Sequence, residues 1–172
     1  MSAFLVSEME SPVGTLLLGM YNGELCCVEF GRLDQLSDSL KKWARRWTGA
    51  DRLIVDGKAL QPFRSQLEQY FAGNRKTFDL PVRLYGTPFQ LRVWSALSSI
   101  PYGETRSYKE VAKKIGCDKA VRAVGGANHR NPLSIIVPCH RVIGSDGSMV
   151  GYGGGLSVKI RLLELEAKYK ER

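Results

Sequence analysis

The first thirty residues carry short apolar runs divided by turn residues, a pattern typical of strands. Pro12-Val13-Gly14 separates the first run from the second. Asn22-Gly23 then divides residues 15–21 from residues 24–30, and this dipeptide is the signature of a two-residue type I′ hairpin turn. The pattern predicts a strand before Pro12 and a hairpin over residues 15–30.

Helical spacing replaces the strand pattern after residue 30. Apolar side chains recur every three or four positions in two stripes, first Leu36, Leu40, Trp43, Ala44 and Trp47, and then Leu60, Phe63, Leu67, Tyr70 and Phe71. This period predicts two amphipathic helices. The polar face of the first carries Lys41, Lys42, Arg45 and Arg46, and Gly73-Asn74 ends the second. Residues 1–80 are therefore expected to form a small α/β domain, in which we find no catalytic pattern.

From Tyr85 the pattern changes to short helices that begin with recognisable caps. Thr87-Pro88-Phe89-Gln90 is a capping box with proline at the first helical position, and Ser107-Tyr108-Lys109-Glu110 is a second capping box. A third helix is expected over about 119–127. Two short helices joined by a glycine-containing turn are typical of a helix-turn-helix. The chain is therefore expected to have an α+β fold, with a mostly helical second domain over 86–172.

The third of these helices has an unusual composition for a recognition helix. It has almost no long polar side chains that could read the edges of bases. Its small residues, among them Ala123, Gly126 and Ala127, would let the backbone approach a surface closely, and Arg122 is the one long side chain among them. A regulator that reads sequence would be built otherwise.

Composition and charge narrow the classes of function. The 172 residues are 44% hydrophobic and 24% charged, which excludes disordered and fibrous classes. The net charge of +8 lies wholly in residues 80–172, because residues 1–79 contain ten basic and ten acidic side chains. Such a distribution favours a polyanionic partner, most often nucleic acid. A domain that is basic without such a partner remains the alternative.

The sequence also indicates where the protein acts and what it lacks. It has no transmembrane run and no secretory leader, so we expect a cytoplasmic protein without a membrane partner. With two histidines and no C-x-x-C pattern, neither a structural zinc nor any other metal is expected. Cys26, Cys27 and Cys117 are interpreted as small apolar packing residues.

The fourth cysteine lies in a pattern that suggests chemistry. The apolar run over 133–137, predicted to be a strand, leads through Pro138 into Cys139-His140. A nucleophilic cysteine must become a thiolate, which a neighbouring base promotes. The glycine-rich stretch 151–155 is expected to be a mobile loop, and the helix predicted over 157–170 brings Glu164 and Glu166, either of which could orient the imidazole.

These residues resemble a known family. Ile136 to Gly144 is similar to the I/V-P-C-H-R-V signature of the alkylguanine-DNA alkyltransferases, the methylated-DNA–protein-cysteine methyltransferases. Further family motifs follow the family order: Thr87-Pro88-Phe89-Gln90, Ile100-Pro101-Tyr102-Gly103, Ser107-Tyr108, Arg122-Ala123-Val124-Gly125, Asn131-Pro132, Gly151-Tyr152 and Leu162-Leu163-Glu164-Leu165-Glu166. The resemblance is close over 86–168, and residues 1–80 are similar to a typical family N-terminal half. The zinc ligands of the animal members have no counterpart here, which indicates the metal-free bacterial type.

The resemblance implies a suicide alkyl transfer from O6-alkylguanine in DNA, with no cofactor and with transfer from alkylated thymine left open. Cys139 would be the nucleophile and acceptor, and His140 would take its proton through a water molecule. Glu166 would steady the imidazolium, and Asn131 would complete the hydrogen-bond network. Tyr108 would meet the leaving guanine.

The resemblance further implies that duplex DNA is bound at the minor groove with the target base flipped out, by a monomeric protein. Arg122 would fill the place of the flipped base. The expected DNA contacts are Arg122, Tyr108, Lys109, Lys119, Ala123, Gly126, Ala127 and Ser145. The expected pocket walls are Val142, Tyr152 and Gly153.

Two other functions fit parts of the pattern. A helix-turn-helix regulator or a non-reactive lesion sensor would bind DNA without reacting, and Cys139 argues against it. A cysteine hydrolase would turn over repeatedly, and the adjacency of Cys139 and His140 and the DNA-binding helix argue against that.

Overall fold

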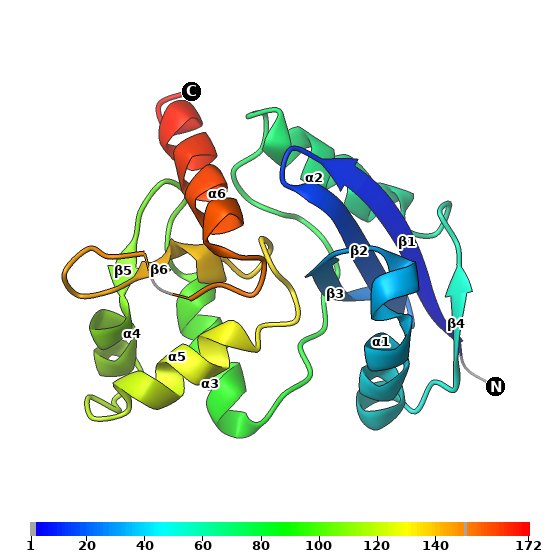
Figure 1. Cartoon of the computed structure of the whole chain (residues 1–172), viewed down its shortest axis with the longest axis horizontal. Helices are drawn as coiled ribbons and strands as arrows, with labels where there is room; N and C mark the ends of the chain where they lie inside the picture. The colour runs from blue at the N-terminus through cyan, green and yellow to red at the C-terminus, as the bar shows by residue number, and fades with distance from the viewer. Residues whose placement is uncertain (1–2, 150) are drawn as a thin grey trace. The chain divides into compact units, whose positions relative to one another are not determined.

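The computed structural model describes residues 3–149 and 151–172, and the chain divides into two compact units, Met1–Tyr85 and Gly86–Arg172. Figure 1 shows the elements of both units in chain order. Each unit buries its own set of apolar side chains.

Unit 1 is built on a four-stranded sheet in the order β3-β2-β1-β4. Its strands are β1 (Ala3–Ser11), β2 (Gly14–Tyr21), β3 (Glu24–Phe30) and β4 (Arg52–Val55). The predicted hairpin is confirmed, since β2 and β3 pair antiparallel and both turn residues have positive φ, 51° at Asn22 and 78° at Gly23. A type I′ turn requires positive φ at both positions. The short strand β4, parallel to β1, was not predicted.

The two predicted helices of unit 1 are confirmed as α1 (Leu33–Thr48) and α2 (Gln61–Phe71). In Figure 1, α1 lies in front of the sheet and α2 behind it. Leu40 and Ala44 of α1 join a buried cluster with Phe4, Cys26 and Cys27. The interpretation of these two cysteines as packing residues is therefore confirmed.

Unit 2 consists mainly of helices: α3 (Pro88–Ser98), α4 (Tyr108–Lys114), α5 (Val121–His129) and α6 (Leu156–Tyr169). Both capping boxes are confirmed, because the Thr87 hydroxyl accepts from the backbone N–H of Gln90 at 3.2 Å and the Ser107 hydroxyl accepts from that of Glu110 at 3.0 Å. Helix α5 begins two residues later than expected, after a turn in which the Ala120 N–H donates to the Cys117 carbonyl at 2.8 Å. The helices α3, α4 and α5 pack against one another.

Two very short strands join distant parts of unit 2. β5 (Arg106–Ser107) pairs parallel with β6 (Val142–Ile143). The first precedes α4, and the second follows the 3₁₀ turn η1 (Cys139–Arg141) directly. The ladder therefore brings the start of α4 to the segment that contains the cysteine.

The prediction of a strand over 133–137 is wrong. The segment is a tight turn, closed by a hydrogen bond from the Val137 N–H to the Leu133 carbonyl at 2.9 Å. Ile135, which is buried, has a φ of 74° in the left-handed region that branched residues rarely adopt. An apolar run is buried in either conformation, so its composition alone did not separate a strand from a buried turn.

No helix in the described ranges combines the length and the apolar character that crossing a bilayer requires.

Candidate active site

The side chain of Asn131 shapes the turn that carries the cysteine. Its Oδ1 accepts from the Leu133 N–H at 3.0 Å, and its Nδ2 donates to the Val137 carbonyl at 2.8 Å. Asn131 is buried, and these bonds satisfy backbone groups that would otherwise be buried without partners. The expected tie between Asn131 and this segment is present, although the segment is a turn. Cys139, only 4% exposed, follows it at the start of η1.

His140 and Glu166 form a pair that is wholly buried. Nε2 of His140 lies 2.6 Å from Oε2 of Glu166, and both side chains have no exposed surface. Because a carboxylate only accepts, Nε2 carries the hydrogen, and a neutral imidazole then has its lone pair on Nδ1. Nδ1 is buried and has no hydrogen-bond partner among the described residues. Burial lowers the pKa of His140 and outweighs the opposing effect of Glu166, so the ring is a neutral base.

Glu166 is held by more than the histidine. Its Oε1 accepts from the backbone N–H of Gly103 at 3.0 Å and from Nε of Arg141 at 2.8 Å, and its Oε2 accepts from Nη2 of Arg141 at 3.0 Å. Burial alone would raise the pKa of this carboxyl, but the bonds and charges of His140 and Arg141 outweigh burial and hold the pKa well below its usual range. Glu166 is therefore ionised at every physiological pH. The other candidate, Glu164, is exposed.

The thiol of Cys139 is buried, and the groups around it change its pKa in opposite directions. Burial raises its pKa, while the side chains of Asn131 and Tyr152 and the charge of Lys159 lower it. Burial prevails, so the resting group is the thiol, which needs a base to become a thiolate. The adjacent imidazole is a suitable base.

Lys159 is a site residue that the sequence analysis missed. It lies on α6, has no exposed surface, and its Nζ is 5.8 Å from the centre of the Tyr108 ring. A signal was present in the sequence, because Lys159, Leu162 and Glu166 are three and four residues apart and therefore share one helix face. All three are buried.

Tyr108 begins α4, where the β5–β6 ladder brings it to the cysteine segment. Burial raises the pKa of its hydroxyl, Cys139 raises it further when it is a thiolate, and a hydrogen bond with the side chain of Asn128 lowers it. Asn128, which was not expected in the hydrogen-bond network, is 3% exposed and donates from Nδ2 to the Cys139 carbonyl at 3.4 Å. Tyr108, Asn128 and Cys139 are thus brought together.

The three expected pocket residues differ in their surroundings. Val142 is fully buried, Tyr152 is 8% exposed and interacts with Cys139, and Gly153 is exposed. A Cβ built on Gly153 would lie 3.9 Å from the carbonyl oxygen of His129, so the loop passes close to the end of α5.

Most residues expected to contact DNA are accessible. The exposed ones are Lys109, Lys119, Arg122, Ala123, Gly126 and Ser145, and Tyr108 is half-buried. A Cβ built on Gly126 would meet no atom within 4 Å, so the backbone of α5 is open to close approach there. The expectation for Ala127 is wrong, because its side chain is 4% exposed. Its carbonyl accepts from the indole N–H of Trp94 at 2.8 Å, which anchors α5 to α3.

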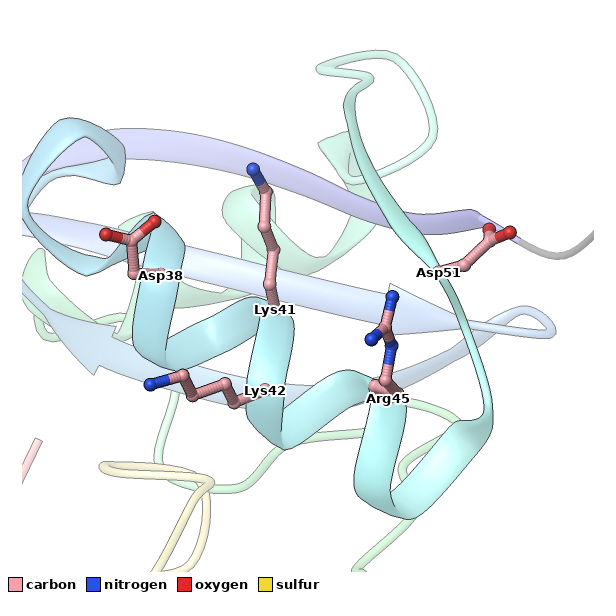
Figure 2. Close-up of a pocket in the computed structure, with 5 residues that line it drawn as sticks. All are labelled: Asp38, Lys41, Lys42, Arg45 and Asp51. Atoms are coloured by element: carbon pink, nitrogen blue, oxygen red, sulfur yellow. The ribbon is translucent and has the colours of Figure 1, made fainter.

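Unit 1 has a hollow of a different kind. A cavity of about 360 Å³ along α1 is lined by Asp38, Lys41, Lys42, Arg45 and Asp51. Figure 2 shows Lys41 and Arg45 on one side of the helix, with Lys42 pointing away from them. These side chains carry both signs of charge and include no nucleophile beside a base. Among the described residues, no group of three or more His, Cys, Asp or Glu is placed to hold a metal ion.

Comparisons with known proteins agree with this geometry. The family model of the 6-O-methylguanine DNA methyltransferase DNA-binding domain matches residues 88–168, and that of the ribonuclease-like domain of the same proteins matches residues 5–84. The constitutive methylated-DNA–protein-cysteine methyltransferase of Bacillus subtilis is 56% identical over 166 residues, which cover 95% of this chain and 96% of the relative. The corresponding Mycobacterium leprae protein is 46% identical over 92% of this chain and 90% of its own length.

The solved structures give the same result. A crystal structure of Mycobacterium tuberculosis OGT in complex with DNA has a TM-score of 0.82 and 42% identity, covering 97% of this chain and 94% of that one. The family models, the relatives and this structure all extend over both units. The chain therefore belongs to the 6-O-methylguanine DNA methyltransferase family.

Proposed function

We propose that this protein repairs DNA by moving the alkyl group of O6-alkylguanine irreversibly to Sγ of its own Cys139. The observation that carries the proposal is a buried cysteine next to a histidine whose far nitrogen is bonded to an ionised glutamate. This is the arrangement that activates a nucleophile through an oriented base. The similarity to methylated-DNA–protein-cysteine methyltransferases supports it.

In the proposed reaction, Nδ1 of His140 takes the thiol proton, through one water molecule. Sγ of Cys139 then forms a bond to the alkyl carbon while the bond from that carbon to O6 of guanine breaks. The electron pair of the broken bond leaves with the base, and the hydroxyl of Tyr108 supplies a proton to it. The proton held by His140 then returns through water to the Tyr108 oxygen. The net result is a thioether on Cys139 and a guanine in which the proton of the thiol has replaced the alkyl group.

Glu166 and Lys159 stabilise the charges that form on His140 and Cys139 in this step. When His140 becomes an imidazolium, Glu166 Oε2 at 2.6 Å stabilises it. The positive charge of Lys159 lowers the pKa of Cys139 and so favours the thiolate. Because the thioether is stable and nothing in the reaction removes it, each molecule reacts once.

The reacting atom of a stacked base is out of reach of a buried thiol, so the nucleotide must be flipped out, which costs a few kcal/mol. Arg122 on the exposed part of α5 would fill the vacated place, and Lys109 and Lys119 would pair with phosphates. Ser145, Ala123 and Gly126 complete the proposed contact surface. The complex of Mycobacterium tuberculosis OGT with DNA supports duplex DNA as the partner. We propose a cytoplasmic, monomeric protein.

The deciding experiment for the reaction is intact-mass analysis after incubation with a duplex that contains one methylated guanine. We expect a gain of one methylene per protein, located by peptide mapping on Cys139. Binding of the duplex without any gain in mass would favour the non-reactive lesion sensor. Repeated release of a methylated product would favour a hydrolase.

Arg122→Ala tests the DNA contacts separately. This variant should lose at least about tenfold in rate on duplex DNA but little on free alkylated guanine base, because the free base needs no flipping. Arg161→Ala, on the exposed face of α6, is the control. Equal losses on both substrates would assign Arg122 to the fold or the chemistry.

A further inference from the structure

Arg141 lies directly after the cysteine and the histidine and is 6% exposed. Its guanidinium makes two bonds to one carboxylate, Nε to Oε1 of Glu166 at 2.8 Å and Nη2 to Oε2 at 3.0 Å. The remaining nitrogen, Nη1, donates to the carbonyl of Ile100 at 2.7 Å. A planar guanidinium bound at both oxygens fixes the plane and the rotamer of the carboxylate.

The same carboxylate oxygen therefore serves two partners. Oε2 of Glu166 accepts from Arg141 and also lies 2.6 Å from Nε2 of His140. A buried carboxylate with no other cation would favour a positively charged imidazole. Here the positive charge of Arg141 offsets the negative charge of Glu166, so the carboxylate attracts a proton to His140 less strongly.

We propose that Arg141 is a positioning residue for alkyl transfer: it fixes Glu166 and balances its charge, so that His140 rests as a neutral imidazole with its lone pair on Nδ1. This inference rests on the proposed function, in which His140 accepts the thiol proton. Without Arg141, only burial and the charge of Lys159 would oppose the pull of Glu166 on a proton at His140. A larger share of the base would then be protonated before any substrate is bound.

Among the charged groups around the histidine, Arg141 is the one that binds the Glu166 carboxylate directly. Helix α6 contributes Glu166 and Lys159, and η1 contributes Cys139 and Arg141 itself. Tyr102, from the turn after α3, lies with its ring centre 5.6 Å from the Arg141 guanidinium, and burial raises the pKa of its hydroxyl, so it is neutral. Lys159 acts on His140 in the same direction as Arg141, since both charges lower the pKa of the imidazole.

The test compares the pH dependence of the alkyl-transfer rate in wild type, Arg141→Met, Arg141→Lys and the control Arg161→Met. In Arg141→Met the pKa of His140 should rise, so the acidic limb of the profile should move up by about one pH unit. Arg141→Lys retains the charge but not the two parallel bonds, so its limb should stay near that of wild type while its rate falls several-fold. Arg161→Met should match wild type in both respects.

A second measurement applies to the wild-type protein and does not depend on any variant folding. The ¹⁵N chemical shifts of His140 should report a neutral ring protonated at Nε2 at pH 7. An imidazolium at that pH would overturn the proposal, as would Arg141→Met and Arg141→Lys losing rate equally with an unmoved acidic limb. Failure of the proposed function would be seen separately, as no gain in mass by the wild-type protein, with the chemical shifts unaffected.

Discussion

The two units of this chain bury different kinds of side chain. Unit 1 fills its core with apolar residues, and among its described residues only Ser7 is both polar and buried. Among its described residues, unit 2 buries two asparagines, a serine, a histidine and three charged residues, Arg141, Lys159 and Glu166. Burying polar and charged groups is unfavourable unless each is paired. In unit 2 these groups surround the reactive cysteine and serve the proposed chemistry. The core of unit 1 has an apolar composition that serves stability.

The sharpest way to test this contrast is to make one change at two buried cysteines. Cys139→Ser should abolish alkyl transfer and leave lesion binding and stability nearly unchanged, because Asn131 and Tyr152 provide polar neighbours for a hydroxyl. Cys27→Ser should keep full transfer but lose about 1–3 kcal/mol of unfolding free energy, since its hydroxyl would lie in an apolar core. Intact-mass assays and urea unfolding measure the two effects. Transfer by Cys139→Ser would show that another residue is the acceptor.

Glu166→Gln should damage both chemistry and stability in unit 2. The amide no longer stabilises an imidazolium, so transfer should fall on the order of 100-fold or more. Arg141 would be left buried without a carboxylate, at a cost of about 3–5 kcal/mol. Single-turnover rates and thermal unfolding are the measurements, with the exposed Glu164→Gln as control. If both variants behave alike, the buried pair has no special role.

The same carboxylate predicts how acid affects stability. The pKa of Glu166 is depressed in the folded state, so its contribution is complete above the unfolded pKa of about 4.3 and is lost as pH falls below it. Between about pH 5 and pH 2, the unfolding free energy of Glu166→Gln should therefore fall less than that of wild type. Acid unfolding curves of the two proteins that run parallel throughout this range would contradict the assignment.

Lys159→Met separates charge from packing. Removing the positive charge should raise the pKa of Cys139 further and slow transfer about tenfold at neutral pH. Methionine has a similar length and needs no solvation, so stability should fall far less than in Glu166→Gln. The control is Lys168→Met on the exposed face of α6. A loss of stability as large as that of Glu166→Gln would assign Lys159 to the fold.

Glu29 of unit 1 is a partly buried acid in a mainly apolar surrounding, and it predicts the smallest effect. Burial raises the pKa of Glu29 to about 7. Because this exceeds the unfolded value of about 4.3, the folded state binds more protons between these pH values, and stability falls as pH rises through them. Glu29→Gln should therefore be more stable than wild type at pH 8, on the order of 1 kcal/mol, and equal to it at pH 4, with transfer unchanged. Exposed Glu68→Gln should show no such gain.

Local signals in the sequence predicted local structure well. The Asn22-Gly23 turn and both capping boxes depend on neighbouring residues only, and all three are confirmed. The short strand β4 was missed because most of its residues are exposed, so burial imposes no alternation on them. The turn over 133–137 was missed because its conformation depends on the side chain of Asn131, outside the apolar run.

The family motifs identified the cysteine, the histidine and the glutamate, which the structure brings together with Asn131 and Tyr108. They did not identify the buried partners Arg141 and Lys159 as site residues, and they did not predict the hydrogen bond from Asn128 to the Cys139 carbonyl. Lysine and arginine are mostly exposed, so only the folded structure distinguishes a buried one from the many at the surface. Ala127 was expected on the exposed face of α5 but is buried, because a small residue gives no sign of which helix face it occupies.

Ile135 has a consequence for moving this site elsewhere. A branched residue in the left-handed region costs about 1–2 kcal/mol, and burying its side chain returns about 1.5–3 kcal/mol. That balance holds only while Asn131 binds both ends of the turn and the surrounding unit covers Ile135. Grafting Pro138-Cys139-His140-Arg141 into another scaffold would carry the reactive groups without the backbone that aims them. The four-residue signature alone is therefore not expected to form this site in another protein. A design that moves it must include residues 131–141 with their apolar surroundings.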